Sequence, residues 1–194
     1  MDAYTAGRTA GDGLAAVAAA ERAFALIERW GKPKNIARAR AILDELWEIS
    51  VAPTPATAAR LADLVEGLPD AKVNDPEFPH QTALEALFNA ARILGGVRHS
   101  GDLMTPDLFS ELDALAEEYA DGPRIRFVDP RNPPPAGPFE AEEEQRVLRD
   151  QREAAVAGPA VSWVAFRTRA EDERRDLANR LGPLVEFSRD IRRR

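Results

Sequence analysis

The chain has 194 residues, of which 44% are hydrophobic and 30% are charged, and its formal net charge at pH 7 is −7. This length fits one domain, or one domain with an extension, and the excess of acidic residues opposes non-specific attraction to nucleic acid and to anionic lipid. Because the chain has no cysteine, disulfides, thiol nucleophiles and thiolate metal sites are excluded.

Alanine and leucine supply most of the hydrophobic fraction, and aromatic residues make up only 7% of the chain, which favours helices over sheets. No stretch approaches the roughly 18 uninterrupted apolar residues of a membrane span. The first residues also lack the basic and apolar regions of a signal peptide. We therefore expect an all-α cytoplasmic protein that does not enter a membrane.

Proline, glycine and capping residues divide the amino-terminal half into separate helices. The first is predicted over about residues 12–30, and its inward candidates recur at helical spacing: Leu14, Val17, Phe24 and Ile27. The second is predicted over about residues 35–49. Its apolar side chains occupy more than one side, which indicates the centre of a bundle.

Thr54-Pro55 and Thr105-Pro106 are the same helix-start signal, in which a hydroxyl caps free N–H groups and proline takes the first helical position. They predict a short third helix that extends to about Leu68, and a fifth helix from residue 105. Between them, a fourth helix is predicted over about residues 80–94 and ends at two glycines.

The chain changes character in its last third. A proline-rich segment over residues 121–138 predicts an extended crossing over the bundle surface, and a sixth helix follows over about residues 140–157. We expect a multi-helix bundle of about five to six helices in a domain of residues 1–157. Residues 158–194 are expected to form a charged C-terminal helical extension.

This extension is predicted to be a helical arm that packs less tightly than the bundle. Residues 167–176 are almost wholly charged, with alternating sign, which is typical of a solvated helix. Gly182-Pro183 should bend or break the arm, and four apolar residues should hold it: Trp163, Val164, Leu177 and Leu181. Two crossed arms would provide opposite charge and form a homodimer.

Three segments carry a resemblance to a known family: Ala20-Glu21-Arg22 with residues 40–48, then residues 79–94, then residues 142–148. Over about residues 20–151 the chain resembles the YjaG-like family of all-helical bacterial proteins of unknown function, and Leu46-Trp47-Glu48 is the most specific element. The resemblance implies a helical fold and no activity. The chain departs from the family in its first helix, which is neither aromatic-rich nor cysteine-containing.

Two pairs of carboxylates raise the alternative of a magnesium site. Glu45 and Glu48 share one side of the second helix, and Asp63 and Glu66 share one side of the third. All-α nucleotide pyrophosphohydrolases hold Mg²⁺ with a similar E-x-x-E and E-x-x-D pattern, although the second pair is reversed in this chain. The other interpretation is two solvated acidic faces that flank core residues.

Three further features could serve binding. His80, at the start of the fourth helix, could be an acid–base group or a single metal ligand, although a histidine there more often caps the helix or faces water. Trp163 could anchor the last helix to the bundle or to a partner subunit. Arg192, Arg193 and Arg194 form the unopposed basic cluster of the C-terminus, and they carry a second alternative, weak nucleic-acid binding.

The sequence contains no recognisable catalytic motif, its net charge is negative, and a proline run is expected on its surface. These features favour a non-enzymatic protein that acts through a protein surface, of an immunity or adaptor type, because an acidic surface suits the masking of a basic partner. No cofactor is expected, apart from Mg²⁺ under the pyrophosphohydrolase alternative.

Overall fold

The computed structural model describes residues 3–50, 52–69, 71, 79–96, 105–122, 135–157 and 163–191, and all regular structure in these ranges is helical. The all-α prediction is therefore confirmed. None of the described helices combines the length and the apolar character that crossing a bilayer requires. In chain order the helices are α1 (Ala3–Trp30), α2 (Pro33–Ile49), α3 (Pro55–Glu66), α4 (Pro79–Leu94), α5 (Thr105–Asp121), α6 (Pro138–Ala157), α7 (Trp163–Arg180) and α8 (Gly182–Ile191).

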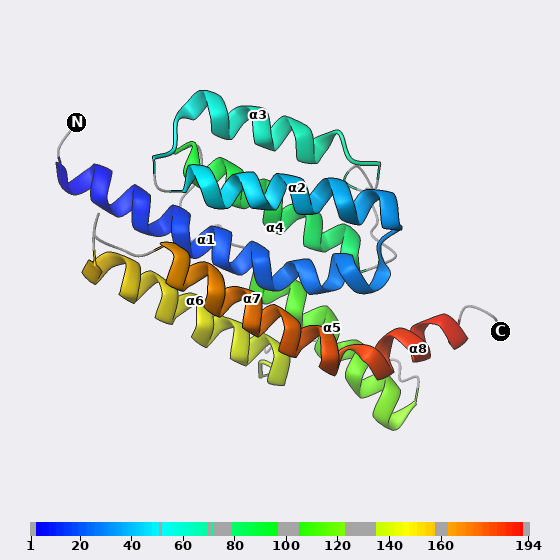
Figure 1. Cartoon of the computed structure of the whole chain (residues 1–194). Coiled ribbons are helices and arrows are strands. Elements are labelled where there is room, and N and C mark those ends of the chain that lie inside the picture. Colours follow the sequence, from blue (N-terminus) through cyan, green and yellow to red (C-terminus); the bar gives the residue numbers. More distant parts are fainter. Residues whose placement is uncertain are drawn as a thin grey trace, which may run out of the picture.

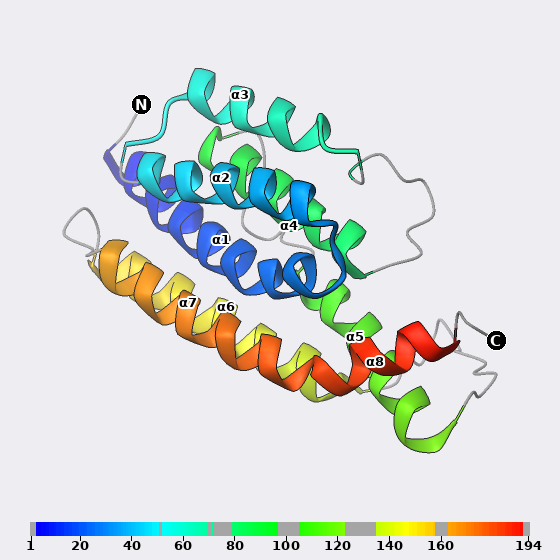
Figure 2. The ribbon, with the colours of Figure 1, turned by 45° about the vertical axis from the view of Figure 1, so that its right-hand side comes forward.

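Helix α1 forms the centre of the bundle. It contacts α2 and α4 on one side and α6 and α7 on the other (Figure 1, Figure 2). All of residues 14–27 are buried, because a helix that is apolar on almost every side must be covered all round. The expectation that the second helix is the centre is wrong, since α2 leaves Ala37, Arg38 and Ala41 exposed.

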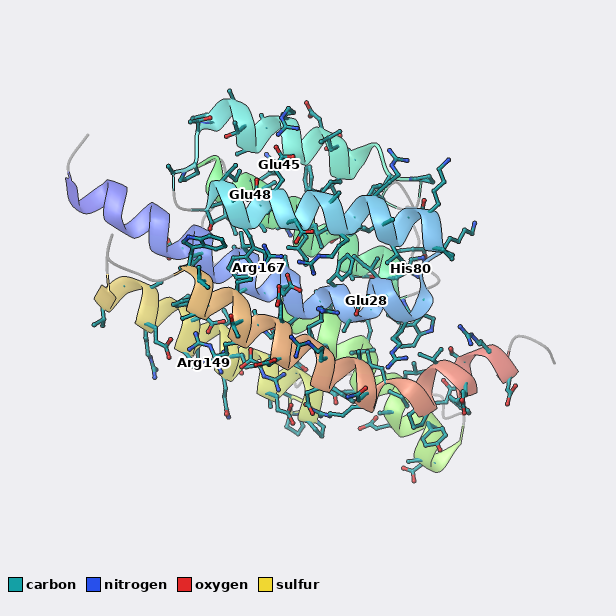
Figure 3. All side chains as sticks on the ribbon, viewed as in Figure 1. Glu28, Glu45, Glu48, His80, Arg149 and Arg167 are labelled. Atoms are coloured by element: carbon teal, nitrogen blue, oxygen red, sulfur yellow. The ribbon has the colours of Figure 1, made fainter. Side chains whose placement is uncertain are left out.

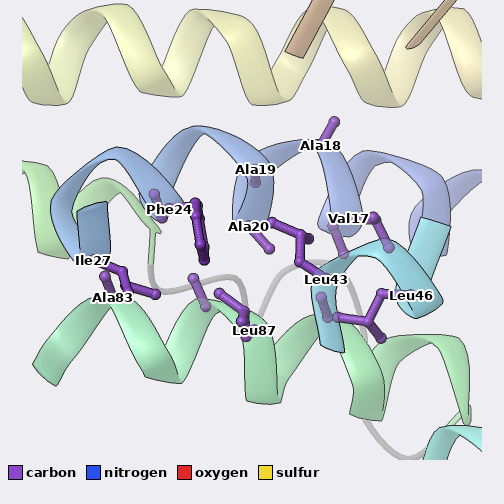
Figure 4. Close-up of a cluster of buried hydrophobic side chains, with 14 of the residues drawn as sticks. Val17, Ala18, Ala19, Ala20, Phe24, Ile27, Leu43, Leu46, Ala83 and Leu87 are labelled. Carbon is purple, nitrogen blue, oxygen red and sulfur yellow. The ribbon is translucent and has the colours of Figure 1, made fainter. Parts of the chain in front are cut away.

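The apolar core lies mainly between α1, α2 and α4. The predicted inward residues of α1 are all buried, and Figure 4 shows Phe24 and Ile27 directed toward Ala83 and Leu87 of α4. Ala18 points to the opposite side of α1, toward α6. The many alanines of α1 leave space for neighbouring helices on both sides, and they also favour the helical conformation.

Several predicted helix ends are confirmed. Thr54 caps α3, since its Oγ1 accepts from the Thr57 N–H at 3.2 Å and the Thr54 N–H donates to the Thr57 hydroxyl at 3.3 Å. After α4, Gly96 adopts a φ of 71°, which glycine reaches without strain. Helix α7 ends just before Gly182-Pro183. The predicted proline-rich crossing lies mostly outside the described residues.

The start of α6 is held by a side chain of α5. Asp113 is buried, and its carboxylate accepts from the N–H groups of Phe139 and Glu140, each at 2.9 Å. These are free N–H groups of the first helical turn, so Asp113 caps α6 across 26 residues of sequence. A Cβ atom at Gly137 would lie 2.3 Å from Asp113 Cγ, and only glycine allows this approach.

Candidate functional site

Two adjacent charged residues lie in the middle of the buried helix α1. Glu21 is 0% exposed and Arg22 is 1% exposed, and apolar residues surround them along the chain. Successive residues of a helix point in directions about 100° apart, so the two side chains reach different neighbours. Burial of an ionised group is costly unless it is paired and hydrogen-bonded, so their partners decide whether this arrangement is stable.

Arg22 joins α1 to α6 and α7. Its Nε donates to both oxygens of Glu143, at 3.0 and 2.8 Å, and its Nη1 donates to Asp150 at 2.7 Å and to Glu173 at 3.3 Å. Glu143 and Asp150 are both fully buried. Among the described residues, the buried Nη2 of Arg22 has no hydrogen-bond acceptor.

A second layer of arginines surrounds these carboxylates and links α6 to α7. Arg149, which is labelled in Figure 3, donates to both oxygens of Glu173, at 2.7 and 3.1 Å, and also contacts Asp150. Arg169 of α7 donates to Asp150 at 2.8 Å and to Glu153 at 2.7 Å. Asp150 and Glu173 are therefore each bound by Arg22 and by at least one further arginine, while Glu143 accepts from Arg22 through both of its oxygens.

Glu21 joins α1 to α2 and, separately, to α7. Its carboxylate accepts from Arg40 at 2.6 and 3.1 Å, from the Trp47 indole N–H at 2.8 Å, and from Arg174 Nε at 2.9 Å. Arg174 also pairs with Glu28. Four hydrogen bonds compensate the buried charge of Glu21, which explains why α1 tolerates it.

Asp44 of α2 extends this network toward the surface. It accepts from Arg40 at 2.7 Å and from Arg167 of α7, which is labelled in Figure 3, at 2.6 Å. Burial would raise the pKa of Asp44, but the hydrogen bonds and charges of the two arginines lower it below its usual value. Asp44 therefore carries its negative charge in the folded state over a wider pH range than a free aspartate does.

Burial also shifts the pKa values of Arg22 and its partner Glu143. It would lower the pKa of Arg22, but the charges of Glu143, Asp150 and Glu173 raise that pKa above its ordinary value. Burial raises the pKa of Glu143, and Arg22 opposes this shift through its charge and its hydrogen bonds. Opposite charges from α1, α6 and α7 lie in direct contact in this network, so the arrangement is suited to fixing these helices in place.

The structure does not bring together the four carboxylates of the magnesium alternative. No group of three or more histidine, aspartate or glutamate side chains in the described ranges is placed to hold a metal ion. Glu45, which is labelled with Glu48 in Figure 3, instead forms an ion pair with Arg60 of α3. The other three carboxylates are exposed: Glu48, Asp63 and Glu66.

The remaining candidates have different outcomes. His80 is only 6% exposed, so the expectation that it faces water is wrong. Trp163 is half-buried and packs against the core of its own chain. Arg192, Arg193 and Arg194 lie outside the described residues, so nucleic-acid binding by this cluster stays a prediction.

The charged C-terminal stretch is not a solvated arm. Helix α7 lies along α1 and buries Phe166, Ala170, Leu177 and Ala178. Leu177 and Leu181 are buried as predicted, whereas Val164 is 54% exposed and is no anchor. The opposite charge expected from a second copy comes from α1, α2 and α6 of the same chain, because Arg167, Arg169, Glu173 and Arg174 pair with them.

Acidic residues gather on a different part of the molecule, along α5, and Glu85 of α4 lies next to them. Helix α5 contains six acidic residues and no basic one. Burial raises the pKa of Glu111, a hydrogen bond from Thr82 of α4 opposes this shift, and the like charge of Glu85 adds to it. Glu118 follows Glu111 by seven residues and so lies on the same side of α5. We call Glu85, Glu111 and Glu118 the acidic face.

An aromatic side chain lies beside the acidic face. Tyr119 is 52% exposed, and its ring meets Phe187 of α8 edge-on, with 5.3 Å between the ring centroids. Exposed tyrosine beside charged residues is typical of protein-binding surfaces, because its ring offers contact area and its hydroxyl offers a hydrogen bond.

Comparison of the chain with protein-family models, with curated proteins and with solved structures finds no match. The resemblance to the YjaG-like family therefore stays a prediction. The function is therefore inferred from the geometry of the described residues.

Sequence reasoning missed the network around Glu21 and Arg22. The signal for it was present, because these two residues interrupt a helix that is otherwise apolar on all sides from residue 14 to residue 27. Charges in that position must be buried and must find partners. The alternating charges of residues 167–176 are such partners, which explains why they appeared too polar for an interior helix.

Proposed function

We propose that this chain is a non-enzymatic cytoplasmic protein that binds a basic protein partner through the acidic face of α4 and α5. The observation that carries the proposal is the separation of charge. Arginines of α1, α2, α6 and α7 pair with carboxylates of neighbouring helices, whereas α5 contributes acidic residues alone. Most of the net charge of −7 therefore lies on α5, the helix that contains no arginine.

Charge complementarity would steer a basic partner to this face and orient it there. Burial is the main cause of the raised pKa of Glu111, and the like charge of neighbouring Glu85 adds to it, so the two carboxylates repel each other in the free protein. An arginine or lysine of the partner would relieve this repulsion. Tyr119 would add apolar contact area next to the charged contacts. An immunity or adaptor role fits this mode of binding.

Affinity capture from a lysate of the source cells tests the proposal. The acidic-face variant carries Glu85→Gln, Glu111→Gln and Glu118→Gln. A matched variant carries Glu48→Gln, Asp63→Asn and Glu66→Gln, which removes the same number of negative charges from exposed positions on α2 and α3. Circular dichroism melting curves establish that both variants are folded.

We expect the unmodified chain and the matched variant to retain the same basic protein in stoichiometric amount at low salt. The acidic-face variant should lose it, and high salt should release it from the unmodified chain and from the matched variant. The proposal is wrong if no stoichiometric protein is retained at low salt, or if both variants lose the partner equally.

A further inference from the structure

Helix α6 leaves one side uncovered. Its buried residues, Glu143, Val147, Asp150 and Ala154, face the bundle, and Arg149 and Glu153 reach toward α7. On the opposite side, Leu148 is 42% exposed and Val156 is 89% exposed. Glu144, Arg152 and Ala155 are exposed on the same side. We call this side, from Ala141 to Val156, the outer face of α6.

The residues of the outer face form complementary or matching pairs at equal distances before and after Leu148. Glu144 lies four residues before Leu148, and Arg152 lies four residues after it. Ala141 and Ala155 lie seven residues before and after it. Positions four and seven residues apart fall on one side of a helix, so all five residues form one continuous strip.

Glu144 and Arg152 cannot satisfy each other within one chain. Side chains on one helix meet when they are three or four residues apart. These two residues are eight residues apart, about 12 Å along the helix, which is too far for a direct contact. Neither residue forms an ion pair in the part of the chain that the structure describes. Each therefore presents an uncompensated charge of opposite sign on either side of an exposed leucine.

We propose that the outer face of α6 is the contact surface between two copies of this chain, with the two α6 helices antiparallel and the two-fold axis at Leu148. In an antiparallel pair centred there, a residue n positions after Leu148 faces the residue n positions before it in the partner subunit. Glu144 thus meets Arg152 of the partner subunit, and symmetry forms this ion pair twice. The small side chains of Ala141 and Ala155 meet at both ends and let the helices approach closely.

This surface differs from the C-terminal arm that the sequence suggested for a homodimer. The outer face is a narrow strip on a single helix, whereas stable interfaces bury about 1,200 Å² or more. The dimer is therefore expected to depend on protein concentration, and measurements must cover a range of concentrations.

Disulfide trapping tests the position of the axis, because the chain has no cysteine of its own. Leu148→Cys places one thiol on each side of the axis, within bonding distance. Val156→Cys is the matched control on the same helix, where the two thiols would lie about 24 Å apart along the antiparallel pair. Under mild oxidation at equal concentration, we expect Leu148→Cys to form covalent dimers at least tenfold faster.

Val156 is the more exposed of the two residues, so random collisions would favour Val156→Cys. Equal rates, or faster trapping through Val156→Cys, would overturn the proposal.

Charge reversal tests the pairing. Glu144→Arg and Arg152→Glu each place like charges opposite one another, and sedimentation velocity should show the dimer dissociation constant rise at least tenfold. The double variant restores both ion pairs in reversed order and should dimerise like the unmodified chain. An unmodified chain that stays monomeric at every concentration would overturn the proposal, as would a double variant that behaves like the single ones.

Discussion

Replacement of Arg22 by methionine should cost more stability than any other single substitution in the charged network. The guanidinium is 1% exposed and pairs with Glu143, Asp150 and Glu173. Arg22→Met keeps an unbranched side chain but leaves Glu143 without the cation that hydrogen-bonds to both of its oxygens. Removal of one partner from a buried ion pair costs about 3–5 kcal/mol.

This loss is large compared with the net stability of an ordinary domain, which is about 5–15 kcal/mol. Urea unfolding at pH 7.5, followed by circular dichroism at 222 nm, measures it. Arg175→Met is the matched control on α7, because Arg175 and its partner Asp172 are each 61% exposed. An exposed pair contributes less than about 1 kcal/mol, so the control should unfold near the unmodified chain.

The pH dependence of the loss identifies Glu143 as its cause. Without Arg22, the pKa of buried Glu143 should rise further above its ordinary value, so the folded state binds a proton more tightly than the unfolded state. The loss should be largest above the folded pKa and should shrink as the pH falls toward the unfolded value of about 4.3. A second substitution, Glu143→Met, should recover part of the stability at pH 7.5.

The reasoning fails if Arg22→Met loses no more stability than Arg175→Met. It also fails if the loss is the same at pH 5 and pH 7.5, because the unpaired carboxylate would then not be responsible.

Other substitutions test the helix start of α6 and the surface end of the network. Gly137→Ala should destabilise the fold by about 1–3 kcal/mol, because its Cβ would lie 2.3 Å from Asp113 Cγ, and thermal melting measures this. Gly182→Ala is the control, since a Cβ there meets nothing within 4 Å, and a melting point lowered equally in both variants would contradict the argument. Asp44→Asn should lower stability at pH 7, because the pKa of Asp44 is lower in the folded state than in the unfolded state. Such a carboxylate stabilises the fold above its unfolded pKa of about 3.9, and this contribution is lost as the pH falls through the lower folded pKa. The difference from the unmodified chain should therefore vanish in strong acid, and a difference that grows on acidification in urea titrations would refute it.

Helix positions were predictable because local chemistry determines them. Thr54-Pro55 starts a helix through its own hydroxyl and proline ring, and Gly182-Pro183 separates two helices wherever they pack. The central position of α1 was harder to predict, because alanine is common both in buried helices and on exposed helical surfaces. The uncharged stretches over residues 14–20 and 23–27 distinguish α1 from α2.

The charge network was not predictable from local patterns. Arg22 and Glu173 are 151 residues apart in the chain, and no periodicity connects them. A sequence does not show whether a charged residue faces water or forms a buried ion pair. Residues 167–176 therefore resemble a solvated helix. Only the fold, which places α7 against Glu21 and Arg22, distinguishes the two cases.

The pairing of α7 with α1 also determines how these helices can be aligned. Glu21-Arg22 on α1 meets Glu173-Arg174 on α7 crosswise, with each carboxylate opposite a guanidinium. If α7 shifted by one turn along α1, Glu173 would no longer lie opposite Arg22. Arg169 would take its place after a shift in one direction, and Leu177 after a shift in the other. Either shift leaves buried charges uncompensated, so two adjacent residues on each helix suffice to select one alignment among neighbouring ones. Apolar packing alone would discriminate less, because the alanine-rich surface of α1 changes little from one turn to the next.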